Sequence, residues 1–205
     1  MAVTNEARIW AFIAQSGHGK GLLMKAALDK LKPKRIIILD KKDENGKYAE
    51  LVPSLTELAK QTFKKEFRVR YRLRAMDRKG RREEFEMLCR IASAAGNCVY
   101  MVEELGTYTT PSYAPEAWAD CCNDGRHDGL HIIAASQFPA QLDKSFMSNC
   151  TEMWCGYLGE EPHRVVMAKK MDIPPDQIKA LRQFHFLHFH KQNRTVTPVV
   201  AKIPR

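Results

Sequence analysis

The sequence contains a glycine-rich stretch, AQSGHGKG at residues 14–21, between an apolar run and an amphipathic segment. Glycines allow backbone N–H groups to close around phosphate oxygens, and a lysine at a helix start reaches the β and γ phosphates. Gly17, Gly19 and Lys20 supply these features. Residues 9–14 (IWAFIA) are continuously apolar, as in a buried parallel strand. The arrangement predicts a loop that binds a nucleoside triphosphate such as ATP.

The expected nucleotide contacts come from this loop and the first helical turn: Ala14, Gln15, Ser16, Gly17, His18, Gly19, Lys20, Gly21 and Leu22. Two positions depart from the pattern G-x-x-x-x-G-K-[ST]. Ala14 replaces the first glycine, and Gly21 replaces the Ser or Thr whose hydroxyl would coordinate Mg²⁺. Mg²⁺ would then depend on nucleotide oxygens, water and nearby carboxylates. Slow hydrolysis, or none, is consistent with such a loop.

Apolar and amphipathic segments alternate along the rest of the chain, which is typical of an α/β fold. The patterns predict strands over residues 35–39, 67–73, 98–102, 130–136 and 153–158, and helices over residues 83–95, 113–122 and 163–170. A polar turn between residues 184–189 and 195–201 indicates an antiparallel hairpin. We therefore expect one P-loop NTPase (RecA-like) domain over residues 1–205, with a mainly parallel sheet flanked by helices and a C-terminal β-hairpin.

Two carboxylates follow the apolar strand predicted at residues 98–102. Open α/β sheets bind ligands at the carboxyl ends of their strands, so Glu103 and Glu104 are placed as a Walker B pair. We expect Glu103 to orient Mg²⁺ through its water shell and Glu104 to polarise the attacking water. The strand over residues 130–136 ends at Gln137, whose amide can donate to the γ-phosphate and accept from that water.

An arginine, Arg126, lies in the glycine-flanked turn at residues 125–129. A planar guanidinium holds two phosphate oxygens at once, so Arg126 is a candidate for contacting the nucleotide of a neighbouring subunit. A solvated surface arginine is the alternative interpretation.

The net charge of +9 is concentrated in one part of the chain. Residues 60–90 hold twelve basic and five acidic side chains, a surplus of seven. Arg68, Arg70, Arg72 and Arg74 alternate with apolar residues on the predicted strand. This arginine stripe could hold the phosphates of a DNA duplex or protect an edge strand from aggregation, and the sequence leaves both interpretations open.

The six cysteines include no C-x-x-C pair and are interpreted as core residues of a cytoplasmic protein. His185, His188 and His190 cannot converge on a metal from one straight strand, because successive side chains point to opposite faces. No apolar run is long enough for a transmembrane segment.

Residues 9–141 resemble the FtsK/HerA superfamily of DNA-pumping ATPases, in which a phosphate loop, an acidic pair and a Gly-Arg, apolar strand, Gln-x-Pro signature follow in this order. Residues 125–139 (GRHDGLHIIAASQFP) are similar to that signature. The size of the chain is most similar to the genome-packaging ATPases of tailless, membrane-containing viruses. The resemblance implies a homo-oligomeric ring that uses ATP and Mg²⁺ to move double-stranded DNA, with capsid or membrane-vertex proteins as partners and a location in the host cytoplasm or at a virion vertex.

Two other functions remain compatible with the residues alone. A nucleotide or small-molecule kinase would be monomeric and would need an acceptor, whereas a nucleotide-binding scaffold with impaired hydrolysis would bind ATP without turnover. A motor differs from both, because its hydrolysis should rise with duplex DNA.

Overall fold

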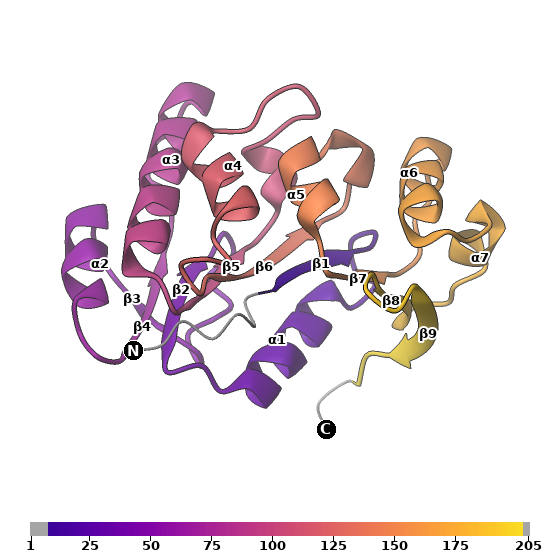
Figure 1. Ribbon diagram of the computed structural model, residues 1–205, viewed down its shortest axis with the longest axis horizontal. Coiled ribbons are helices and arrows are strands. Elements are labelled where there is room, and N and C mark those ends of the chain that lie inside the picture. The colour runs from indigo at the N-terminus through magenta and orange to yellow at the C-terminus, as the bar shows by residue number, and fades with distance from the viewer. Residues whose placement is uncertain (1–7, 203–205) are drawn as a thin grey trace.

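A twisted nine-stranded sheet forms the centre of the chain (Figure 1), and the computed structural model describes residues 8–202. The strand order is β3-β4-β2-β5-β6-β1-β7-β8-β9. The strands are β1 Ile9–Ile13, β2 Arg35–Leu39, β3 Glu50–Leu51, β4 Phe67–Tyr71, β5 Val99–Val102, β6 His131–Ser136, β7 Glu152–Cys155, β8 His185–His190 and β9 Thr195–Val200. The pairs from β3 to β7 are parallel, and β7, β8 and β9 pair antiparallel. The expected parallel sheet and C-terminal hairpin are confirmed.

Helices cover both faces of the sheet, with α1 on one face and α3, α4 and α5 on the other (Figure 1). The α-helices are α1 Lys20–Leu31, α2 Leu55–Thr62, α3 Arg78–Ala95, α4 Glu116–Asn123, α5 Lys144–Asn149, α6 Glu161–Met171 and α7 Pro175–Lys179, and the 3₁₀ helices are η1 Leu105–Thr107 and η2 Pro139–Gln141. None of the helices within residues 8–202 is both long and apolar enough to cross a bilayer.

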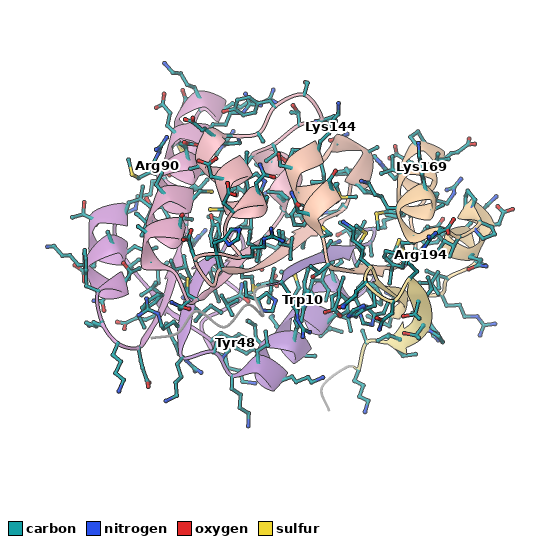
Figure 2. The ribbon with its side chains drawn as sticks, viewed as in Figure 1. Trp10, Tyr48, Arg90, Lys144, Lys169 and Arg194 are labelled. Carbon is teal, nitrogen blue, oxygen red and sulfur yellow. The ribbon has the colours of Figure 1, made fainter. Side chains whose placement is uncertain are left out.

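The alternation of side chains along β1 divides the core between the two faces. Ala11 and Ile13 pack on the face that carries α3 and α4, whereas Phe12 packs on the face that carries α1. Trp10 lies beside Phe12 on the α1 side and Tyr48 covers the same side further along the sheet (Figure 2). Each fully buried Leu, Ile or Phe stabilises the fold by about 1.5–3 kcal/mol relative to an exposed one. All six cysteines are buried and free, as expected of core residues.

Several predicted boundaries are wrong, mainly at helix starts. The helix predicted from residue 83 begins at Arg78, because the Asp77 carboxylate caps it by accepting a hydrogen bond from Gly80 N at 2.9 Å. The helix predicted from residue 113 begins at Glu116, because the chain first makes a turn in which Thr110 N donates to Tyr113 O at 2.8 Å.

The alternation along residues 67–74 predicts that the four arginines share one face of a half-buried strand, but the structure gives them different environments. Arg70 points inward and forms ion pairs with Asp40, at 3.0 Å, and with Asp43. Its side chain is only 12% exposed, and Asp40 is fully buried. The strand is not an edge strand either, since β4 lies between β2 and the two-residue strand β3. Strand β3 pairs only with Val69 and Arg70, so edge protection does not explain Arg70.

Candidate nucleotide-binding site

The loop after β1 has the backbone of a phosphate-binding loop. Gly17 and Gly19 have φ angles of +76° and +95°, which side chains with a Cβ rarely adopt. The loop leads directly into α1 at Lys20, so free N–H groups of the helix start face the same space. A cavity of about 320 Å³ lies here and is lined by Ser16, Gly17, Gly19, Lys20, Gly21, Leu22, Met24, Lys25, Lys42, Glu44, Glu103, Glu104, Ala135 and Phe184.

Lys20 folds back onto its own loop. Its Nζ atom donates to Ala14 O at 2.5 Å and to Gln15 O at 3.3 Å. Burial lowers the pKa of Lys20 to about 8, Glu104 acts against this shift, and Lys42 adds to it. An anion at this position would favour the protonated lysine, so the site is prepared electrostatically for phosphate.

The structure explains one departure from the common loop pattern and leaves the other open. The methyl group of Ala14 fits because the facing residue is Gly156, where an added Cβ would lie 2.8 Å from Ala14 Cβ. A Cβ on Gly21 would meet no atom within 4 Å, so sterics do not require glycine there. The missing hydroxyl at position 21 is a chemical change without a packing reason.

Glu103 lines the cavity, and hydrogen bonds from the loop after β2 fix its carboxylate. Its carboxylate accepts hydrogen bonds from Lys41 N and Asn45 Nδ2, each at 3.0 Å. Burial raises the pKa of Glu103, and the hydrogen bond from Asn45 opposes the shift. The loop after β2 therefore fixes this carboxylate against the wall of the cavity.

Glu104 and Gln137, predicted to act together, are in contact. Gln137 Nε2 donates to Glu104 Oε1 at 2.9 Å, although the residues follow different strands, β5 and β6. Glu104 has a left-handed backbone, φ 51° and ψ 53°. Such a conformation is unfavourable for a residue with a side chain, and conformations of this kind concentrate at functional sites. It directs Glu104 into the cavity that contains Lys20.

Arg126 lies at the opposite edge of the sheet from this cavity. It precedes β6, whereas Gln137 follows the same strand. Six strand residues span about 20 Å at 3.3 Å per residue, so Arg126 cannot reach the nucleotide site of its own subunit. The side chain is exposed, and its Nε donates to His127 at 3.4 Å.

The C-terminal hairpin supports the loop, a contact that the sequence did not predict. Gln183 Nε2 donates to Gly17 O at 2.9 Å, and a Cβ on Gly19 would lie 2.8 Å from the Phe184 ring. The His18 ring stacks on Tyr157, with centroids 5.1 Å apart. About 140 to 170 residues of sequence separate these partners, so no local pattern could identify them.

The strand order and the loop between β1 and α1 define the fold of the P-loop NTPases. Solved structures of this fold are similar over nearly the whole chain. The genome-packaging NTPase B204 from Sulfolobus turreted icosahedral virus 2, in complex with AMPPCP, is 20% identical with a TM-score of 0.78, covering 96% of this chain and 98% of that one. The plasmid coupling protein TrwB with the GTP analogue GDPNP is 12% identical with a TM-score of 0.71, covering 98% and 87%.

One relative is similar in sequence. Protein P9 of Pseudoalteromonas phage PM2 is 30% identical over 103 residues, which cover 48% of this chain and 47% of that protein. The match thus spans about half the length of the relative. No protein-family model matches the chain.

Proposed function

We propose that this chain is an ATP-hydrolysing motor that translocates double-stranded DNA, as in viral genome packaging. The observation that carries the proposal is the hydrogen bond from Gln137 to Glu104 beside the phosphate loop. It joins a proton acceptor to an amide that can contact both the attacking water and a phosphate. The similarity of the fold to the packaging NTPase B204 supports the same conclusion.

In this proposal, three side chains divide the chemistry of hydrolysis. Lys20 exchanges its contacts with Ala14 O and Gln15 O for the β and γ phosphates of ATP. Glu104 accepts the proton of the attacking water, and Gln137 holds that water in line with the γ-phosphate. Release of the γ-phosphate would change the Gln137–Glu104 contact, which gives β5 and β6 a way to register hydrolysis.

Mg²⁺ is the metal that this chemistry implies, and the carboxylates at the cavity fit a hydrated ion. Glu103 and Glu104 both line the cavity, but position 21 offers no hydroxyl. Mg²⁺ keeps several waters and often binds through one or two carboxylates and substrate phosphates. When bound, it would neutralise charge on the phosphates, and Glu103 would hold it through water.

The same proposal includes a homo-oligomeric ring that encloses DNA. Arg126 is exposed and remote from its own cavity, which suits a residue that contacts the nucleotide of a neighbouring subunit. Capsid or membrane-vertex proteins are the expected further partners, and the host cytoplasm or a virion vertex is the expected location.

The test is the rate of ATP hydrolysis with and without linear duplex DNA, with Lys20→Ala as the blank. A rate that rises with DNA is expected. An equal rate in both conditions contradicts a translocase, and turnover that needs an added acceptor indicates a kinase. ATP binding without turnover would favour a nucleotide-binding scaffold, which the missing hydroxyl at Gly21 makes the second candidate.

A further inference from the structure

A strongly basic segment follows β4 at residues 72–82, and we call it the basic segment. It holds one acidic side chain, Asp77, and six basic ones: Arg72, Arg74, Arg78, Lys79, Arg81 and Arg82. The surplus of five positive charges is more than half of the net charge of +9 for the whole chain. Such a concentration on eleven residues attracts polyanions.

Two cations of the basic segment have acidic partners: Arg72 pairs with Asp43 at 3.5 Å and Lys79 pairs with Glu83 at 3.8 Å. Asp77 caps α3, and Glu84 accepts a hydrogen bond from the backbone N of Arg74 at 2.7 Å. Within residues 8–202, Arg74, Arg78, Arg81 and Arg82 form no ion pair.

The far end of the same helix is different. Arg90 of α3, labelled in Figure 2, pairs with Glu86 at 2.7 Å and with Glu116 at 3.7 Å. Within α3, unpaired positive charge is therefore concentrated near the start of the helix, at Arg78, Arg81 and Arg82.

The basic segment lies on the same edge of the sheet as the nucleotide cavity. Strand β4 runs parallel to β2 and β5, so the residues after Tyr71 emerge at the edge where Glu103 and Glu104 follow β5. Three lysines at the end of α2 and in the turn before β4 instead lie at the opposite edge: Lys60, Lys64 and Lys65. The chain therefore provides exposed positive charge at both edges, but only one set is near the site of hydrolysis.

A buried tyrosine lies between α3 and the segment that carries Glu104. Tyr108 follows η1, is 3% exposed and stacks on Phe85 of α3, with ring centroids 4.6 Å apart. Burial raises the pKa of Tyr108; Glu103 and Glu104 add to this shift and Arg81 opposes it. Tyr108 N donates to Leu105 O and Thr107 N donates to Glu104 O, each at 2.9 Å, so backbone contacts continue from the stacked ring to Glu104.

We propose that the basic segment binds the phosphate backbone of duplex DNA and that Tyr108 transmits this contact to Glu104. The proposal rests on the proposed function, because it assigns the surface and the coupling residue for DNA in that function. The exposed large side chain within the segment is Met76, so contact with the duplex backbone is favoured over stacking on unpaired bases.

The first test uses two variants with the same loss of charge. The triple variant Arg74→Gln/Arg78→Gln/Lys79→Gln removes three cations from the basic segment, and Lys60→Gln/Lys64→Gln/Lys65→Gln removes three from the opposite edge. The logarithm of the association constant for duplex DNA falls as the logarithm of salt concentration rises. The magnitude of this slope should be smaller by about 2.7 in the first variant, because each lost phosphate contact removes about 0.9. It should stay unchanged in the second. Equal slopes in the two variants overturn the assignment of the surface.

Hydrolysis distinguishes failure of this inference from failure of the proposed function. The basic-segment variant should keep the basal ATPase rate and lose stimulation by DNA. If the unmodified protein hydrolyses no ATP, the proposed function fails, while the salt series still tests the surface. If the variant is stimulated as strongly as the unmodified protein, the inference fails and the motor remains.

The coupling role has its own variant, Tyr108→Leu, which removes the ring that stacks on Phe85 and leaves every charge of the basic segment in place. We expect unchanged DNA affinity and a lower thermal stability, with a smaller ratio of stimulated to basal rate. A merely structural role would alter stability without altering that ratio. A ratio equal to that of the unmodified protein overturns the coupling.

Discussion

Buried carboxylates at the two edges of the sheet have opposite surroundings. Glu152, at the amino end of β7, accepts hydrogen bonds from Trp10 Nε1 at 2.9 Å and from Arg8 Nη1 at 3.4 Å. Its other carboxylate oxygen lies 2.8 Å from His188 Nε2. Burial would raise its pKa, but His188, Trp10 and His190 together outweigh burial and the pKa is lowered. At the carboxyl end of β5, burial prevails and raises the pKa of Glu103.

The difference separates a structural edge from a reactive one. At the amino edge, both carboxylate oxygens of Glu152 have hydrogen-bond partners within the protein. At the carboxyl edge, Lys20 turns back on its own loop and Glu104 has a single side-chain donor, Gln137. Groups that are incompletely satisfied within the protein are those available to a ligand. Substitutions should therefore cost binding and turnover at one edge and stability at the other.

The largest effect is expected for Lys20→Ala, which should abolish ATP binding. The loop loses its own positive charge at the cavity, and Lys25 and Lys42, which also line the cavity, lie outside the loop. Lys30→Ala, on the same helix and exposed, is the control with the same change of charge. Calorimetric titration with ATP measures both variants. Unchanged affinity in Lys20→Ala would show that the cavity is not the nucleotide site.

Arg126 is an exception to this division, because it is a proposed catalytic group at the structural edge. If Arg126 contacts the nucleotide of a neighbouring subunit, Arg126→Ala should reduce turnover on the order of 10³-fold. A mixture of Lys20→Ala and Arg126→Ala subunits should regain part of the activity, since each supplies what the other lacks. Lys20→Ala mixed with itself is the control. If a mixture shown to co-assemble recovers no turnover, Arg126 does not act between subunits.

Glu104→Gln should reduce hydrolysis about 10²-fold while leaving ATP binding intact, as expected when a general base is neutralised. Glu103→Gln should be milder, because Glu103 acts only through water on the metal and its amide oxygen can still accept one of the two hydrogen bonds, from Lys41 N or from Asn45 Nδ2, that fix this side chain. Single-turnover rates at saturating ATP compare the two variants. A larger loss in Glu103→Gln would mean that the two roles are reversed.

The sequence predicted the reactive edge better than the contacts behind it. The strand, loop and helix around Lys20 follow from local chemistry, and parallel strands bring Glu104 and Gln137 to one edge regardless of their separation in sequence. The inward turn of Arg70 was not predictable, since its partner Asp40 lies thirty residues away and alternation alone placed Arg70 in solvent. The support of Gly19 by Phe184 likewise depends on tertiary packing.

Glu152→Gln tests the structural edge. Its charged hydrogen bonds should be worth about 1–3 kcal/mol, so the free energy of unfolding falls while ATP affinity stays unchanged. Because the pKa of Glu152 is lowered in the folded state, its carboxylate stabilises the fold at pH values above the ordinary pKa of 4.5. This stabilisation is lost as the pH falls through the folded-state pKa. The difference between the proteins, measured by urea unfolding, should therefore shrink in acid. A loss of ATP affinity would contradict the division between the edges.

The smallest effect is expected at Gly21, where the reactive edge lacks a hydroxyl group although a side chain would fit. A Cβ there meets no atom within 4 Å, so Gly21→Ser fits without rearrangement. Its hydroxyl could enter the Mg²⁺ shell, and a gain of about 1 kcal/mol corresponds to about fivefold tighter Mg²⁺-dependent ATP binding.

Serine also raises helix propensity relative to glycine, so a gain could come from a firmer start of α1. Gly21→Ala separates these causes, because it improves the helix without supplying a hydroxyl. ATP affinity measured with Mg²⁺ and with EDTA should rise in Gly21→Ser only when Mg²⁺ is present. An equal gain in both variants would assign the effect to the helix, and an unchanged Gly21→Ser would place Mg²⁺ out of reach of position 21, held by nucleotide, water and Glu103 alone.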